Sequence, residues 1–431
     1  MIRRAAIEDA APAPAGITNI IANLPLNVSI DPFNVATISI DPLRSSKVIF
    51  VDATFGNNAT AIAYNFYYPY QTILAAKAVA LAGDTIYIRK GTYTQTTISN
   101  SICDYYLEAG AIVQNTINND VFAQSNGGTL NIYGYGILRS SVTNSAVIVA
   151  INNSTINIQC YKIIKNTNIL GMALLCITGG KIYCDCYEID CRFNAVQAAI
   201  ILDANGFIQL TAQIVRFSFL AYQIGNSNNN TINMIINVAE TIAYDMVLAT
   251  GFNNNYCGFI NNGSGIMVVN TRFSTAQTTN STGSLSSIGL NWNNGGNICN
   301  LYINSPANNN VRTNNLFRTG NVNTNGKIIA SGNFKNIQNT GVGVLNVGGT
   351  IDIKGKIEID PTQTASPIEQ QSGDLIINDL ISIAPAAATY SINSPTAQNI
   401  KIYKHVTNKG YNPLITDLIT GSLNIIDPDV N

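Results

Sequence analysis

The stretches TINIQCYKIIKNT (residues 155–167) and KIYCDCYEIDCRF (residues 181–193) align with each other without a gap. TLNIYGYGILRSS (residues 129–141) before them and FIQLTAQIVRFSF (residues 207–219) after them continue the alignment at the same shift. The aligned columns are small or apolar: Leu130, Ile156, Ile182 and Ile208; Ile132, Ile158, Cys184 and Leu210; Gly134, Cys160, Cys186 and Ala212. The shift of about 26 residues is a period typical of solenoid proteins.

Within each stretch, apolar and polar residues alternate with a period of two and β-branched residues are frequent, which predicts strands. A third apolar run recurs in the same register, as AVIVA from Ala146, ALLCI from Ala173 and AIILD from Ala199. Units of three short strands bury their apolar faces only when they stack in parallel. The sequence therefore predicts an all-β fold: a right-handed parallel β-helix with three strands per coil and a period of about 26 residues.

The same register predicts which side chains face the interior between residues 181 and 191. Ile182, Cys184, Cys186 and Ile189 point inward, whereas Tyr183, Asp185, Glu188 and Asp190 point outward. Because cysteines and carboxylates lie on opposite sides of the wall, we expect packed thiols and no metal site. Lys162 beside Glu188, and Arg216 beside Asp190, are expected to form surface ion pairs.

The composition of the chain limits the classes of partner that it is expected to bind. The 431-residue chain is 46% hydrophobic but only 11% charged, its formal net charge is −1, and about one residue in seven is asparagine. A basic face for nucleic acid or anionic lipid is missing, so neither nucleic-acid binding nor membrane insertion is expected. No stretch predicts a cofactor. Asparagine tolerates the left-handed backbone of tight corners, which suits a coiled chain with many turns.

The N-terminal segments lie outside the repeat. Residues 1–45 are rich in Ala and Pro and contain SIDP twice, which predicts an extended arm that lies along a partner surface, with a disordered tail as the alternative. Two arginines near the start are followed by Glu8 and Asp9 before any apolar run develops, so we expect neither a signal peptide nor a transmembrane segment. Within residues 46–100, a helical pattern from Gln71 to Ala82 predicts a helix that caps the first coil.

Residues 51–93 contain a VDA…GN strand, then PYQTI…A, then GDTIYIRKGTY, and this order resembles the entrance of pectin-lyase-like β-helix proteins. That family includes polysaccharide lyases and hydrolases, bacterial adhesins, and the tailspikes and fibres of bacteriophages. Its hydrolases use clustered aspartates with a histidine, and its lyases use calcium-binding aspartates with a basic residue. The single histidine, His405, lies in KIYKHVTNKG near the C-terminus, and no comparable cluster of aspartates is found. The resemblance itself says little about activity, so no catalytic residue is assigned, and the missing signatures favour a non-enzymatic role.

The repeat spans residues 101–400, but its register loosens at 247–325, where Asn-, Ser- and Thr-rich insertions predict flank loops. Tyr256 in GFNNNYCGF and the single tryptophan, Trp292 in GLNWNNGGN, are candidates for stacking on a sugar ring. Packing of these loops against the wall or a neighbouring subunit is the alternative. Residues 401–431 are expected to cap the last coil or to contact another subunit.

From the resemblance, the leading hypothesis is a structural virion appendage of a bacteriophage: a tailspike, tail fibre or head fibre. It would be a homotrimer that docks to other virion proteins through the N-terminal arm and contacts host surface polysaccharide. Such a protein would be made in the host cytoplasm and located in the virion. The alternatives are a polysaccharide depolymerase and a bacterial surface adhesin. A depolymerase needs two carboxyl groups close together, and outward-facing carboxylates stacked on successive strands could provide such pairs.

Overall fold

The structure is a computed structural model. It describes residues 26–30, 36–40, 47–117, 119–167, 171–192, 198–218, 220–225, 231–244, 256–261, 265–275, 284–288, 300–311, 315–319, 326–336, 344–359, 368–382, 392–394, 399–407, 418–419 and 423–425.

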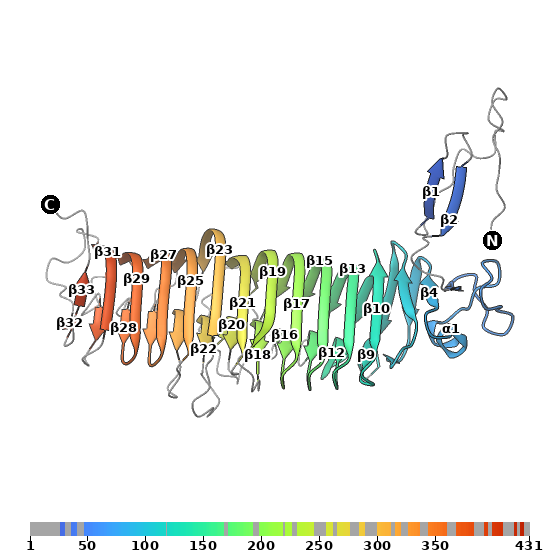
Figure 1. Cartoon of the computed structure of the whole chain (residues 1–431), viewed down its shortest axis with the longest axis horizontal. Helices are drawn as coiled ribbons and strands as arrows, with labels where there is room; N and C mark the ends of the chain where they lie inside the picture. The colour runs from blue at the N-terminus through green and yellow to red at the C-terminus, as the bar shows by residue number, and fades with distance from the viewer. Residues whose placement is uncertain are drawn as a thin grey trace, which may run out of the picture.

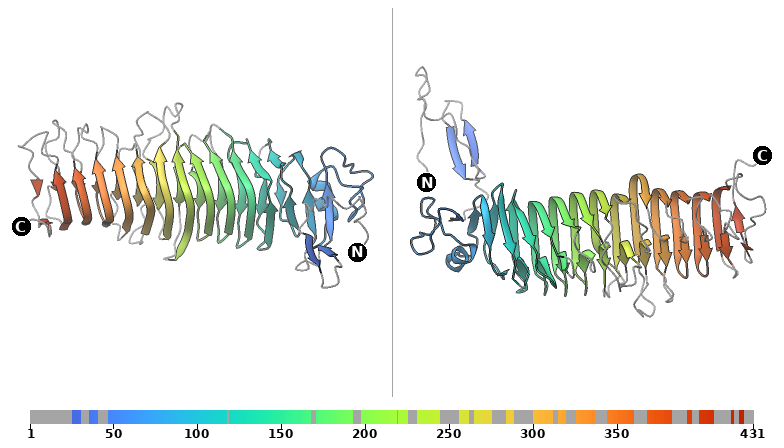
Figure 2. Two further views of the ribbon diagram at one scale, coloured as in Figure 1. Left: turned by 90° about the horizontal axis from the view of Figure 1, so that it is seen from above. Right: turned by 180° about the vertical axis from the view of Figure 1, so that it is seen from behind.

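The chain forms an elongated parallel β-solenoid with its two ends at opposite ends of the rod (Figure 1; Figure 2). Eighteen strands form what we call the wide sheet: β3 (Val48–Val51), β4 (Thr85–Ile88), β5 (Gly91–Thr94), β7 (Asp104–Leu107), β8 (Ala111–Asn115), β10 (Thr129–Gly134), β11 (Ile137–Ser140), β13 (Thr155–Lys165), β15 (Lys181–Cys191), β17 (Phe207–Phe217), β19 (Ile232–Ala243), β21 (Ile266–Thr275), β23 (Asn300–Val311), β25 (Lys327–Asn336), β27 (Thr350–Ile359), β29 (Asp374–Ser382), β31 (Asn399–Thr407) and β33 (Leu423–Ile425).

Thirteen shorter strands form the narrow sheet: β6 (Ile98–Ser99), β9 (Phe122–Gln124), β12 (Ser145–Ala150), β14 (Gly171–Cys176), β16 (Ala198–Leu202), β18 (Leu220–Ile224), β20 (Tyr256–Asn261), β22 (Ser284–Ile288), β24 (Asn315–Thr319), β26 (Val344–Asn346), β28 (Ile368–Gln370), β30 (Ile392–Ser394) and β32 (Leu418–Ile419). The two sheets enclose a continuous apolar core.

The predicted period is confirmed by the strand pairing. Thr129 pairs with Thr155, Thr155 with Lys181, and Lys181 with Phe207, so each partner lies one predicted repeat further along the chain. The period then lengthens, because Ile232 pairs with Ile266 and Ile266 pairs with Asn300. Every one of these pairs is parallel. The looser register expected from the sequence after residue 247 is therefore present as longer coils on an unbroken sheet.

Among the described coils, three strands per coil are seen near the N-terminal end. The coil of β10, β11 and β12 has three, but β13 pairs with both β10 and β11, so one long strand replaces the first two from there to β31. These long strands have between 9 and 12 residues. The long strand bends at a corner, where Tyr161 is exposed and has no partner in the register, and the inward parity shifts from Cys160 to Ile163. The fusion needs no new hydrogen-bond pattern, because both halves already pair in parallel.

The inward columns are as the alignment predicts. Cys160 pairs with Cys186 and Cys186 with Ala212, and all three side chains are buried. In the alignment the same column contains Gly134, whose φ is +114° and whose absent Cβ would lie 2.1 Å from the backbone oxygen of Leu107. The corner therefore tolerates only glycine at this coil and small residues at the next ones.

A short helix covers part of the first coil. α1 (Ile73–Val79) begins after Thr72, whose side chain accepts a hydrogen bond from the backbone N–H of Ala75, and it buries Ile73 and Ala76 against the core. It lies within the predicted range of Gln71 to Ala82. Inside the predicted N-terminal arm, β1 (Leu26–Ile30) and β2 (Ala36–Ile40) pair as an antiparallel hairpin rather than as one extended segment.

Candidate functional site

The outward face of the wide sheet carries two parallel columns of side chains. The first outward column contains Asn131, Asn157, Tyr183, Gln209, Ile235, Val268, Tyr302 and Ile329, one from each successive strand. The second outward column, two residues further along each strand, contains Tyr133, Gln159, Asp185, Thr211, Asn237, Asn270, Asn304 and Ser331. Inward residues separate the columns, so the face is a regular grid of exposed groups.

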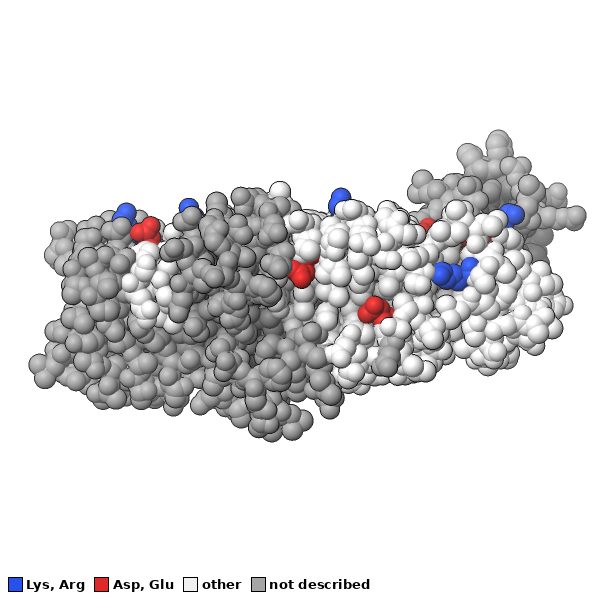
Figure 3. All heavy atoms as spheres, turned by 90° about the horizontal axis from the view of Figure 1, so that it is seen from below, with Lys and Arg blue, Asp and Glu red and all other residues white. Residues whose placement is uncertain are grey.

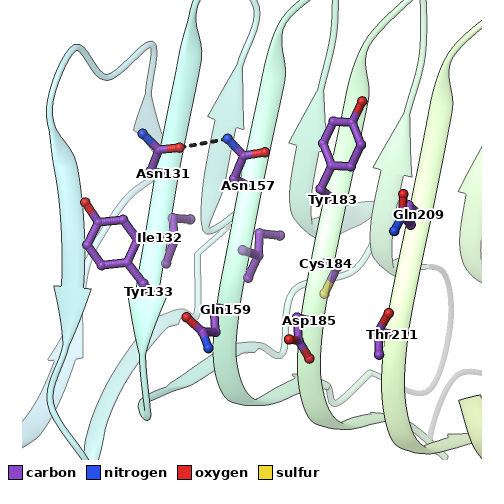
Figure 4. A pocket seen from close by; sticks show the side chains of 11 residues that line it. Asn131, Ile132, Tyr133, Asn157, Gln159, Tyr183, Cys184, Asp185, Gln209 and Thr211 are labelled. Carbon is purple, nitrogen blue, oxygen red and sulfur yellow. Dashed lines mark hydrogen bonds between the residues drawn. The ribbon is translucent and has the colours of Figure 1, made fainter. Parts of the chain in front are cut away.

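The N-terminal half of this grid is hollowed into a groove of about 400 Å³ on strands β10, β13, β15 and β17 (Figure 4). Two tyrosines, five amide or hydroxyl side chains and one carboxylate line it: Tyr133, Tyr183, Asn131, Asn157, Gln159, Gln209, Thr211 and Asp185. Ile132, Ile158 and Cys184 form the floor between the two columns. The groove is therefore shallow, polar and open along the rod.

Hydrogen bonds fix the amides at the first end of the groove. Asn157 donates from Nδ2 to Asn131 Oδ1 at 2.8 Å, and Asn131 donates from Nδ2 to Asp104 Oδ1 at 2.7 Å. The hydroxyl of Tyr133 donates to the other oxygen of Asp104 at 2.7 Å. Because the Asp104 carboxylate only accepts, it sets the direction of the whole ladder and holds both columns in register.

The aromatic rings of the groove are supported from below and beside. Tyr183 packs against Phe207, with ring centroids 5.5 Å apart and an interplanar angle of 48°. Tyr133 packs at 6.3 Å against Tyr106, which stacks on Tyr87 at 5.1 Å. Rings held in this way lose little conformational entropy on contact with a ligand. Aromatic faces with amide donors and acceptors are the groups that stack on and hydrogen-bond to sugar rings.

A separate network of charges lies beyond the corner, on the second half of the long strands. Lys162 Nζ lies 3.2 Å from both Glu188 Oε1 and Asp190 Oδ2, Arg216 Nε lies 2.8 Å from Glu188 Oε1, and Arg192 Nη2 lies 2.8 Å from Asp190 Oδ2. Burial would raise the pKa of Asp190, but the hydrogen bond from Arg192 and the charge of Lys162 outweigh it and hold that pKa below its usual value.

This network corrects two expectations. The carboxylate side chains of Glu188 and Asp190 are only 12% and 7% exposed, so they are not exposed surface pairs. Arg216 stands beside Asp190 in the strand register, as the sequence predicts, but its ion pair is made with Glu188. Cations already engage both carboxylates, so the arrangement supports the wall of the coil and leaves Asp185 as the exposed carboxylate on β15.

The cysteines lie where the alignment predicts. Cys160, Cys184 and Cys186 are buried free thiols. Burial raises the pKa of Cys160 well above the ordinary value, and the hydrogen bond with Cys186, together with burial, does the same for the pKa of Cys184. Thiols of this kind are poor nucleophiles and poor metal ligands. Within the ranges that the structure describes, no group of three or more Cys, His, Asp or Glu side chains is placed to hold a metal ion.

The sugar-stacking residues chosen from the sequence are not brought into this groove. Tyr256 begins β20 on the narrow sheet, and its side chain lies outside the described residues, as does Trp292 entirely. His405 lies on β31 in register with Leu380. The groove lies on the regular repeat rather than on the irregular loops, and its signal in the sequence is the series of polar and aromatic residues at the outward positions of residues 131–211.

Comparison of the chain with family models, with curated proteins and with solved structures finds no match. The likeness of residues 51–93 to pectin-lyase-like proteins therefore remains a resemblance of sequence pattern. Across the described part of the chain, no helix has the length and apolar character needed to cross a membrane. Charged groups are few on the described surface of the face drawn in Figure 3.

Proposed function

We propose that this chain is the rod of a bacteriophage virion appendage, assembled as a homotrimer, and that the groove on its wide sheet contacts host surface polysaccharide. The groove carries the proposal. It combines supported tyrosine rings with a directed ladder of amides, and it runs along the rod across four strands. Adjacent strands are about 4.8 Å apart, so four strands extend over about 14 Å, which fits a few sugar units of a linear chain.

The parallel solenoid supports the mechanical part of the proposal. Its apolar core is continuous from Ile49 to Ile400, so each coil is held by its two neighbours over the whole length. Such a rod places a binding face at a distance from its attachment point. The resemblance of residues 51–93 to a family that includes phage tailspikes is the basis for the proposed virion location and for the proposed trimer. The docking of residues 1–45 to other virion proteins belongs to the same proposal.

Binding to immobilised bacterial capsular and lipopolysaccharide O-antigen glycans tests the groove. The wild-type chain should retain at least one of these glycans, and Tyr183→Ala should weaken that binding about tenfold or more, since truncation of an aromatic side chain that anchors a binding surface costs about 1–2 kcal/mol or more. Tyr135→Ala is the matched control, because Tyr135 is 66% exposed at the corner and lies outside the groove. A chain that binds no glycan, or a Tyr183→Ala variant that binds as tightly as the wild type, would contradict the proposal.

A depolymerase is distinguished by its products. Cleavage of a glycosidic bond needs two carboxyl groups within about 5–10 Å of each other. Asp185 is the one carboxylate among the described residues that line the groove, and Glu188 and Asp190 are held by cations. Release of reducing ends from a bound glycan would replace the binding role by a catalytic one. Labelling of uninfected bacterial cells, rather than phage particles, by an antibody to the chain would favour the adhesin.

A further inference from the structure

The first outward column changes its chemistry midway along the rod. In its N-terminal half the column carries Asn131, Asn157, Tyr183 and Gln209, so three of its four side chains are amides. In the next four strands it carries Ile235, Val268, Tyr302 and Ile329, none of them an amide and all of them partly exposed. We call these four residues the apolar stripe. Ile232, which is 49% exposed, and Ile266 pair with each other beside it. The apolar surface is therefore contiguous over several strands.

The fold does not require apolar residues at these positions. The alternate residues of the same strands, such as Ile236, Val269 and Ile328, point inward and are completely buried. The earlier coils keep the same pairing with amides in the outward column. Because a partly exposed β-branched side chain gains little from burial within its own coil, a contiguous group of them on an otherwise polar face indicates a contact with another molecule.

The second outward column provides a satisfied polar border for such a contact. Asn270 donates from Nδ2 to Asn237 Oδ1 at 2.7 Å, and Asn304 donates from Nδ2 to Asn270 Oδ1 at 2.8 Å. Ser331 Oγ then donates to Asn304 Oδ1 at 3.0 Å. Amides that already bond to one another lose less when water is removed from them than isolated amides do. An apolar centre with a polar border is the usual anatomy of a protein–protein interface.

The absence of charge on this surface is compatible with a second copy of the chain as the partner. The stripe and the four residues of its border carry no formal charge, so two copies of the surface would not repel one another. A basic or acidic partner, by contrast, would find no opposite charge among these eight residues. We infer that the apolar stripe is the surface on which a second copy of this chain packs. This inference rests on the proposed assembly of several chains and names the face that carries it.

Light scattering coupled to size-exclusion chromatography of the full chain at micromolar concentration tests the inference. The wild type should have a mass that is a multiple of 46.2 kDa. Val268→Lys combined with Ile329→Lys should shift the mass to that of one chain, because identical copies would bring like charges together in an apolar contact. Thr129→Lys, an exposed outward position of the same sheet before the groove, is the matched control and should keep the wild-type mass.

Circular dichroism in the far ultraviolet shows whether the lysine variant keeps its strands. If it does not fold, Val268→Thr combined with Ile329→Thr replaces the test, because threonine keeps the β-branched shape, and it should raise the dissociation concentration at least tenfold. A wild-type chain that is monomeric overturns both the proposed assembly and this inference. An oligomer that survives the lysine pair, or dissociates no more readily with the threonine pair, overturns the inference alone. Glycan binding by the groove is measured in its own experiment, separately from the oligomeric state.

Discussion

The two halves of the wide sheet share one backbone pattern and differ in the side chains on their outward face. Ile158 and Ile236 face the same core and are almost completely buried, but their outward neighbours are Asn157 in the first half and Ile235 in the second. The inward-facing side chains, which we call the inward grid, set the fold, and any side chain that fits the core can occur at these positions in either half. The outward grid is free to vary, so its composition carries the information about partners.

The interior shows a related change at the corner where the long strands end. Asn115, Ser140 and Lys165 occupy successive coils of one inward column, and Cys191 and Phe217 occupy it further on. Lys165 is fully buried and its Nζ donates to Ser140 Oγ at 3.1 Å, Ser145 Oγ at 2.9 Å and the Val142 carbonyl at 2.5 Å. The first half of the rod is therefore polar at this interior corner as well as on its face.

The largest expected effect comes from the inward grid. Gly134→Ala places a Cβ against the Leu107 carbonyl at a backbone φ of +114°, so the corner of that coil must move. Strain and overpacking together should lower the free energy of unfolding by about 3–5 kcal/mol. Urea denaturation would measure it, with Tyr133→Ala on the outward face as the control. Equal losses for the two variants would break the distinction between the inward and outward grids.

The next effect concerns the polar interior corner. Burial lowers the pKa of Lys165 from 10.5 to about 8. Between these values the unfolded chain binds more protons than the folded one, so the stability contributed by this residue rises with pH. The free energy of unfolding of the wild type relative to Lys165→Met should increase by about 3 kcal/mol between pH 7 and about pH 10.5.

Denaturation of both proteins across that pH range checks this prediction, because the variant shares every other group that titrates there. A constant difference between them would mean that folding does not lower the pKa of Lys165. Gly171 is part of the same contact, since a Cβ on it would lie 2.0 Å from Lys165 Cε. The polar corner is therefore closely packed around the amine, which explains why burial dominates its pKa.

Ion pairs allow a third test of the two halves. The Asp190 carboxylate is 7% exposed between Lys162 and Arg192, whereas Lys335 and Glu358, paired at 2.5 Å on β25 and β27, are 45% and 25% exposed. Asp190→Asn should cost about 2 kcal/mol of stability at pH 7, and Glu358→Gln should cost less than about 1 kcal/mol.

The pH dependence of the Asp190→Asn effect follows from its cause. The folded pKa of Asp190 lies below the ordinary value of 3.8, so its stabilisation is present above that value and is lost as the pH falls through the folded pKa. The wild type and Asp190→Asn should therefore converge in stability under acid conditions. Thermal unfolding at pH 7 and in strong acid measures the convergence, and a difference that persists in acid would contradict it.

The sequence was sufficient to predict the repeating coil, but it was not sufficient to predict the candidate site. The constant period of the repeat aligned Cys160 with Cys186 correctly, because parallel pairing links positions at a constant separation along the chain. The same alignment could not show that Glu188 and Asp190 are largely shielded from water, since this depends on where Lys162, Arg192 and Arg216 place their long side chains. Nor could it show the groove, whose residues come from four coils and whose hollow depends on ring and amide orientations.

The sequence also could not predict that the single strand β13 takes the place, in its coil, of the two strands β10 and β11 of the coil before. The two stretches align without a gap, and Gly134 and Gly136, which flank the exposed Tyr135, stand where the continuous strand has Cys160 and Lys162. A Cβ on Gly136 would meet both the Leu107 side chain and the Ala111 carbonyl, so this corner is unusually tight. Local backbone geometry, rather than hydrophobic pattern, decides whether the strand is interrupted.

The smallest expected effect separates structure from function in the two amide ladders. Asn157→Ala and Asn270→Ala each remove one amide that donates along its column, to Asn131 and Asn237 respectively, and each should cost about 1 kcal/mol of stability. Their effects on partners should differ: Asn157→Ala should weaken glycan binding and leave the mass of the assembly unchanged, while Asn270→Ala should weaken self-association and leave glycan binding unchanged. Measuring both properties on both variants is informative because the stability costs are matched. Reduced glycan binding in the two variants alike would mean that the whole face is one binding surface, and that the change from amides to apolar residues does not divide it.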